Sequence, residues 1–266
     1  MSIVLAAVDD SVAAGPVITA ALALAPLFGS DVEAVHVGAS SGVTARSCAK
    51  RLGTPFRTIP GEPLDRLVGL ATEGVTAVVV GSRDRPTRKA RVGHLVLQLA
   101  DRLAQPLLVV PPDSVPSDRI ERVLVALKGQ PGRAGPHQHA VEVVADADLD
   151  VTVVHVDDEE AVPGFTDSTA HEPQEVAQEY LARYWPLGPK ARLALPFGSP
   201  AEQVLAVAAD IRPDVVLVGW PQGAGTQHGH VVRELLRRCP HPLLLVAVTR
   251  SGGRDPRRPP GPSSAG

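Results

Sequence analysis

One stretch of the sequence decides the fold, and over residues 78–94 it reads VVVGSRDRPTRKARVGH. A β-branched run that ends on Gly81 is typical of a buried strand. A basic loop follows, and beyond Gly93 leucines recur every four residues from Leu95 to Leu103, which predicts the apolar face of a helix. The stretch therefore predicts a strand, a loop and a helix whose N-terminus faces the loop. Backbone N–H groups and the helix dipole make such a terminus a ready site for an anion.

The same pattern returns in the second half of the chain. Residues 216–219 (VLVG) precede a loop, and Gly229-His230 then opens another segment with apolar residues at helical spacing. Further landmarks repeat in the same order, namely His36-Val37 with His155-Val156, Gly61 with Gly198, and residues 106–110 with 242–246. The chain is therefore predicted to be an internal duplication.

Two domains and a tail are expected. The boundaries are residues 1–113 and 118–249, joined by a proline-rich linker, and the length agrees with about 150 residues per domain. The second domain carries extra residues between Val156 and Gly198, where we expect a longer helix. Residues 250–266 are rich in Pro, Gly, Ser and Arg without an apolar pattern, so this tail is predicted to be disordered.

Composition is that of an ordinary folded protein. The chain has 44% hydrophobic residues, 21% charged residues and a net charge of -3, without the basic excess that favours nucleic acid. No apolar run is long enough to span a membrane, and no basic segment precedes the first apolar residues. A cytoplasmic protein is expected. Cys48 and Cys239 lack metal-ligand spacing and are interpreted as free thiols.

Short apolar segments alternate with helical patterns along each half. In the first half we expect strands at residues 3–8, 32–37, 56–59, 77–80 and 106–110. An apolar stripe, Ala14, Val17, Ile18, Ala21, Leu22 and Ala25, predicts the first helix. Pro63 is expected to open another helix, and Ser199-Pro200-Ala201-Glu202 is predicted to form a capping box.

Alternating strands and helices predict an α/β fold, with a parallel sheet and right-handed crossovers in each half. With strand order 3-2-1-4-5, a ligand would bind where the order reverses, between strands one and four. These strands end at Asp9 and at Gly81. The fifth strands would be exposed edges, so we expect the two halves to cover them mutually as an intramolecular pseudo-dimer, and an isolated first half to dimerise.

Together these motifs resemble the universal stress protein family over roughly residues 2–248. The resemblance rests on the aspartate after strand one, His-Val closing strand two, Gly61-Glu62-Pro63, and the two glycines that bound the loop after strand four. It implies two tandem Rossmann-like domains of the adenine nucleotide alpha hydrolase-like type, each a five-stranded parallel sheet with helices on both faces, used in stress adaptation. It also implies that ATP or another adenine nucleotide is held by Asp9, Val37, Gly81, Arg83, Gly93 and His94.

The two halves depart to different degrees from the family loop Gly-x2-Gly-x9-Gly-Ser/Thr. In the first half Gly81 and Gly93 match its ends, while Asp84 stands at the middle glycine and His94 at the hydroxyl position. In the second half the loop is shorter and Lys128 replaces the strand-one aspartate. The first half is therefore expected to dominate any nucleotide binding.

Simpler interpretations stay open for the same residues. Asp9 is interpreted as a ligand contact, as a helix cap or as part of a solvated turn. The basic loop is interpreted either as a phosphate contact or as a solvated surface. His36 and His155 are expected at the edge of the core. A metal site formed by His137, His139, His228 and His230 is the alternative for these histidines, but none is expected, because His-x-His alone is not a specific pattern.

Two functions follow from these alternatives. One is a regulatory protein that binds an adenine nucleotide in its first domain and signals to an unknown protein partner. The other is a ligand-free interaction and dimerisation module, which includes a homodimer of the full chain. No general base or metal-binding carboxylate pair is visible, so an enzyme is not expected, with weak ATP hydrolysis left open.

Overall fold

A computed structural model describes residues 2–71, 74–82, 93–127, 143–144, 147–156, 191–221 and 229–248. Several expectations fall outside these ranges. They are the disordered tail, the longer helix of the second half, Arg83, Lys128 and the histidines His137, His139 and His228.

The first half of the chain alternates strands and helices as predicted. Its elements are β1 (Ile3–Ala7), α1 (Ala14–Leu24), the 3-10 helix η1 (Ala25–Phe28), β2 (Asp31–Val37), α2 (Val43–Arg51), β3 (Phe56–Ile59), α3 (Pro63–Ala71), β4 (Val75–Gly81), α4 (His94–Arg102) and β5 (Leu107–Val110). We refer to β1 through β5 and their helices as the first lobe.

The second half repeats this order in its described residues. Its elements are β6 (Arg122–Leu127), β7 (Asp150–His155), β8 (Arg192–Ala194), α7 (Pro200–Ile211), β9 (Val215–Pro221), α8 (His230–Arg238) and β10 (Leu243–Val248). We refer to β6 through β10 and their helices as the second lobe. The predicted domain boundaries, 1–113 and 118–249, stay predictions.

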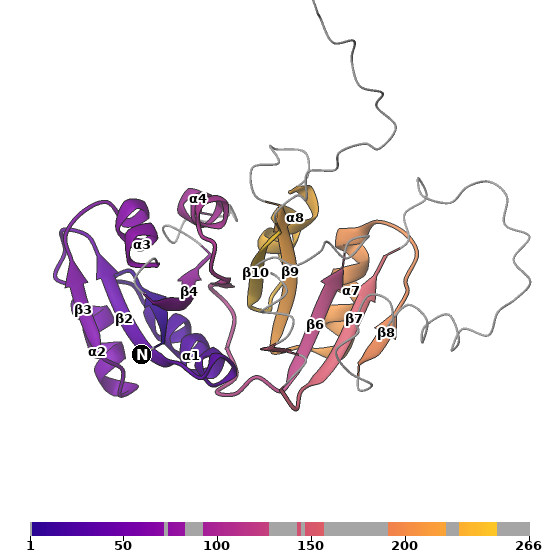
Figure 1. The fold of residues 1–266 in the computed structure, drawn as a ribbon, viewed down its shortest axis with the longest axis horizontal. Coiled ribbons are helices and arrows are strands. Elements are labelled where there is room, and N and C mark those ends of the chain that lie inside the picture. The colour runs from indigo at the N-terminus through magenta and orange to yellow at the C-terminus, as the bar shows by residue number, and fades with distance from the viewer. Residues whose placement is uncertain are drawn as a thin grey trace, which may run out of the picture.

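The strands of both lobes form one continuous sheet in the order β3-β2-β1-β4-β5-β10-β9-β6-β7-β8 (Figure 1). Each lobe thus has the predicted order 3-2-1-4-5, and its strands are parallel. The central pair, β5 and β10, is antiparallel, with residues 107–109 opposite 243–245. The two apolar edges cover one another, so the predicted intramolecular pseudo-dimer is confirmed.

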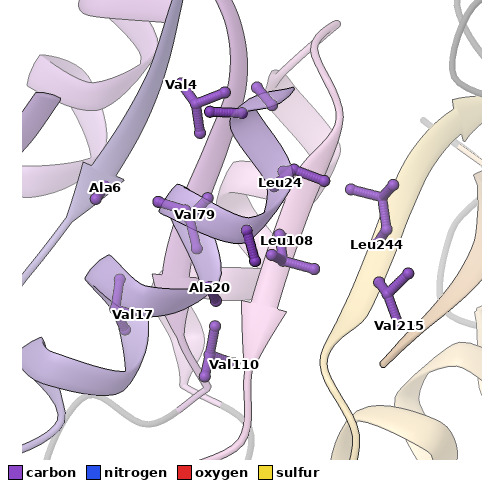
Figure 2. Close-up of a cluster of buried hydrophobic side chains, with 14 of the residues drawn as sticks. Val4, Ala6, Val17, Ala20, Leu24, Val79, Leu108, Val110, Val215 and Leu244 are labelled. Carbon is purple, nitrogen blue, oxygen red and sulfur yellow. The ribbon is translucent and has the colours of Figure 1, made fainter. Parts of the chain in front are cut away.

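The core continues through the junction between the lobes. In one buried cluster, Val17 and Leu24 of α1 lie over Val79 of β4, and Leu108 of β5 pairs with Leu244 of β10 (Figure 2). Burying a Leu or Val side chain contributes about 1.5–3 kcal/mol. A second cluster on the opposite face of the sheet includes buried side chains of α3, α4, α7 and α8. Helices therefore cover both faces, as predicted.

The stripe predicted for the first helix is partly wrong. Leu22 is 37% exposed, whereas Ala20 and Leu24 are buried. The buried face continues as Val17, Ala20, Ala21 and Leu24, which is equally compatible with a helical period.

The capping box predicted at Ser199 is also wrong in its side chains. Ser199 is the N-cap and Pro200 the first helical residue of α7, but the Ser199 side chain makes no capping hydrogen bond. The Glu202 carboxylate instead pairs with Arg238 of α8. A contact between helices thus replaces the local one.

Two expectations from composition can be compared with the structure. Cys48 and Cys239 are both buried free thiols, as interpreted from the sequence. In the described ranges no helix has the length and apolar character needed to cross a bilayer.

Candidate functional site

The carboxyl ends of β1 and β4 lie side by side in the first lobe. Ala7 pairs with Val80 in parallel register, so the residues that follow, Val8 and Gly81, are neighbours at the carboxyl ends of these strands. The chain leaves β1 toward Asp9 and leaves β4 toward the basic loop. The predicted meeting of Asp9 and Gly81 at one edge is therefore supported by the strand register.

Asp9 presents an exposed carboxylate beyond β1. Its Oδ1 accepts a hydrogen bond of 2.6 Å from the Ser11 hydroxyl, which in turn accepts one of 3.1 Å from the Ala13 amide. The N-cap residue of helix α1 is Ala13, whose side chain makes no capping hydrogen bond. Asp9 thus lies in an exposed turn, as one of the simpler interpretations expected, and its carboxylate accepts from Ser11 rather than from the first-turn amides of α1.

The neighbouring Asp10 is the residue that caps a helix. Its Oδ1 accepts hydrogen bonds from the amides of Thr44 (2.6 Å) and Ala45 (3.3 Å) in the first turn of α2. Desolvation raises the pKa of this carboxyl, but these backbone hydrogen bonds outweigh it and leave the pKa below its ordinary value. Asp10 and Thr44 are 34 residues apart, so no local sequence pattern indicates this contact.

His36 contacts both the loop after β1 and the loop after β2. Its Nδ1 donates to the Val8 carbonyl at 3.0 Å, and its Nε2 lies 2.7 Å from the Ser40 hydroxyl. Gly42 has a φ of 60°, and a Cβ there would come within 3.0 Å of the imidazole. The ring is buried, which confirms its predicted place at the core edge. His36 and Asp10 thus fix the loops that follow β1 and β2.

Val37 is the last residue of β2 and is half-buried. It pairs with Ile59 of β3, and β2 neighbours β1 in the sheet. The structure therefore places Val37 one strand away from Asp9, at the same carboxyl edge.

The backbone conformation at position 81 does not require a glycine. The φ of Gly81 lies outside the left-handed region, and an added Cβ would be 3.7 Å from Val17 Cγ2, an ordinary van der Waals contact. Neither the backbone nor packing among the described residues therefore requires glycine here. A close approach by a bound molecule is a physical reason for a glycine at such a position.

Ser82 closes the base of the basic loop. Its amide donates to Val110 of β5, and its carbonyl accepts from the Gly93 amide, both at 2.9 Å. The two residues that flank the loop, Ser82 and Gly93, are therefore hydrogen-bonded to each other, and α4 begins directly beside the end of β4. Gly93 is buried with a φ of -58°, which any L-residue can adopt.

The N-terminus of α4 begins at Gly93-His94. Its N-cap residue is Gly93, which has no side chain to cap the helix. The helix has nine residues, and its dipole and first-turn amides favour an anion near this end. His94 is exposed in the first helical position, at the loop end where it was predicted.

The second lobe repeats this arrangement with a buried tryptophan beside it. Ala126 pairs with Val218, so β6 and β9 end side by side as β1 and β4 do. Trp220 follows Gly219, at the place that Ser82 takes after Gly81, and its indole is 3% exposed. A Cβ on Gly229, the N-cap of α8, would lie 3.3 Å from the ring. Packing against Trp220 therefore explains Gly229.

The model of the universal stress protein family matches residues 119–247. Residues 119–247 belong to the universal stress protein family. The resemblance inferred from the sequence is confirmed for these residues, and the second lobe is a universal stress protein domain. No curated protein is detectably similar to the chain in sequence.

Solved structures extend the likeness over both lobes. A universal stress protein from Archaeoglobus fulgidus aligns with a TM-score of 0.61 and 17% identity, covering 92% of this chain and 98% of that chain. A protein of unknown function from Pseudomonas aeruginosa aligns with a TM-score of 0.64 and 15% identity, covering 93% and 92%. Identities this low show the fold alone. The first lobe therefore has the same fold as the universal stress protein domain that follows it.

Proposed function

We propose that the protein is a regulatory stress-response protein whose first lobe binds an adenine nucleotide. The observation that carries this proposal is Gly81, at the end of β4, a glycine that neither its backbone conformation nor packing against the described residues explains. It lies at the sheet edge reached by Asp9 and beside the start of α4. The chemistry of this edge, with backbone amides for phosphate and a carboxylate for hydroxyl groups, fits a nucleotide.

Each predicted residue has a role in this proposal. The amides at Gly93 and His94 would bind phosphate, and Arg83 would add a salt-sensitive attraction. Asp9 would accept a hydrogen bond from the ribose or from the base, while Val37 would provide an apolar contact. Gly81 would let the ligand approach the backbone closely.

The second lobe is proposed to bind no nucleotide. Trp220 of the second lobe is equivalent to Ser82 of the first lobe. Its buried ring lies against Gly229 at the start of α8. An indole here takes up space that a phosphate would need. The expected stoichiometry is one nucleotide per chain.

Isothermal titration of the full chain with ATP and AMP tests the proposal. We expect measurable affinity in the parent protein and its loss in Gly93→Val, because a branched side chain would stand beside the amides that bind phosphate. Gly69→Val, in α3 with nothing within 4 Å of an added Cβ, should retain the affinity. Absence of binding for every adenine nucleotide would favour the ligand-free interaction module, and parental affinity in Gly93→Val would mean that the first lobe does not hold the site.

A further inference from the structure

Helix α4 connects the ends of the fourth strands of both lobes. At its start, the Gly93 amide donates to the carbonyl of Ser82, the residue after Gly81. Near its end, Asp101 Oδ1 accepts a 2.9 Å hydrogen bond from the indole Nε1 of Trp220, the residue after Gly219. Ser82 and Trp220 hold equivalent positions in the duplication. One helix of the first lobe is thus bonded to both.

The bond between Asp101 and Trp220 crosses from one lobe to the other. The indole is buried, and a buried N–H needs an acceptor. Helix α4 also packs against β10 of the second lobe. The second lobe therefore contacts α4 through a polar bond as well as through apolar packing.

Helix α4 is short and well packed, so the hydrogen bond at Asp101 also restrains the position of its N-terminus. His94 and Asp101 are separated by about 10 Å at 1.5 Å per residue. Val96, Leu99 and Ala100 between them are buried. A displacement at Asp101 would therefore move the whole helix, including the N-terminus beside Ser82, rather than bend one turn of it.

We propose that Asp101 and Trp220 are positioning residues through which the second lobe sets the placement of the α4 N-terminus in the first lobe. The consequence for ligand affinity rests on the proposed nucleotide site at Gly93. On this account the first lobe's site has its working geometry only in the tandem chain. The second lobe thus uses Trp220 to position the neighbouring site through Asp101 instead of binding a nucleotide itself.

The test compares three variants of the full chain. Asp101→Leu removes the acceptor at similar size, Asp101→Asn retains a side-chain carbonyl oxygen, and Trp220→Phe removes the donor while retaining an aromatic ring. Amide hydrogen exchange is measured by NMR at Gly93 and along α4, with the amides of α3 as reference for global stability. ATP affinity is measured by titration on the same samples.

We expect Asp101→Leu and Trp220→Phe to speed exchange at Gly93 and in α4 by about fivefold relative to α3, the effect of losing one hydrogen bond. ATP affinity should fall by a similar factor, and Asp101→Asn should stay within about twofold of the parent in both measurements. Unchanged relative exchange in Asp101→Leu and Trp220→Phe overturns the proposal, as does faster exchange with unchanged affinity. If the parent binds no nucleotide, the nucleotide proposal fails by itself, and the exchange comparison still decides whether the second lobe positions α4.

Discussion

Gly81→Ala separates a structural glycine from one that serves a ligand. The variant adds a single methyl group at the end of β4. That Cβ would lie 3.7 Å from Val17 Cγ2, which is ordinary contact, and the backbone φ needs no adjustment. The substitution is therefore compatible with the fold as it stands.

The expected magnitudes have opposite signs for stability and for affinity. Replacing a strand glycine by alanine gains about 0.5–1 kcal/mol, since the unfolded chain loses freedom. This corresponds to a rise in Tm of about 1–4 °C for a chain of this size. A ligand atom packed on the Gly81 Cα would sit about 3.5–4.0 Å away, and the new methyl would occupy much of that space. Affinity for ATP should therefore fall at least about tenfold, or roughly 1.4 kcal/mol.

The assay pairs thermal unfolding with nucleotide titration. Gly69→Ala is the matched control, because Gly69 lies in α3 with nothing within 4 Å of an added Cβ. It should gain about 1 kcal/mol as a helix substitution and leave affinity unchanged. A Gly81→Ala variant with parental affinity for ATP would refute the reasoning that ties this glycine to a ligand.

Three further predictions concern stability and assembly. Burial raises the pKa of the Asp214 carboxyl, but hydrogen bonds from Ser117 and from the amides of Glu121 and Arg122 lower it by more. The pKa therefore lies below its ordinary value of 3.8. The contribution of this carboxylate to the free energy of unfolding is thus present above pH 3.8 and is lost as pH falls through the folded pKa. In urea titrations, Asp214→Asn should lower the free energy of unfolding by about 1–2 kcal/mol at pH 7 and by less at pH 3. Leu244→Ala should cost about 2–5 kcal/mol in the same titrations, because its side chain is 1% exposed at the lobe junction; a smaller cost would mean that the junction is loosely packed. A fragment of residues 1–113 should dimerise through the uncovered β5 edge, and a folded, strictly monomeric fragment in gel filtration and crosslinking would contradict this.

Local sequence patterns were sufficient to predict most of the fold. Glycine and proline mark the ends of the strands, and β3 occupies the predicted residues 56–59. Apolar fifth strands in both halves imply that each must be covered, and the antiparallel pair of β5 and β10 meets that requirement. These features depend on periodicity and on exposed edges, which a sequence records directly.

The side-chain contacts of the site were harder to predict because they are long-range. Asp10 caps α2 from across a loop, although Asp9 beside it has the same chemistry. Trp220 bonds Asp101 in the other lobe, and neither residue belongs to a motif. A comparison of the two halves contains one signal, since a tryptophan follows Gly219 where a serine follows Gly81. Its partner could only be identified once the lobes were placed together.

Native mass spectrometry of the full chain, purified without added nucleotide and then incubated with ATP, tests the central claim most directly. The account predicts a single mass increment of one adenine nucleotide per chain, absent in Gly93→Val. Spectra that contain only the unliganded mass at millimolar ATP would contradict nucleotide binding. Two increments per chain would contradict the assignment of the site to the first lobe alone.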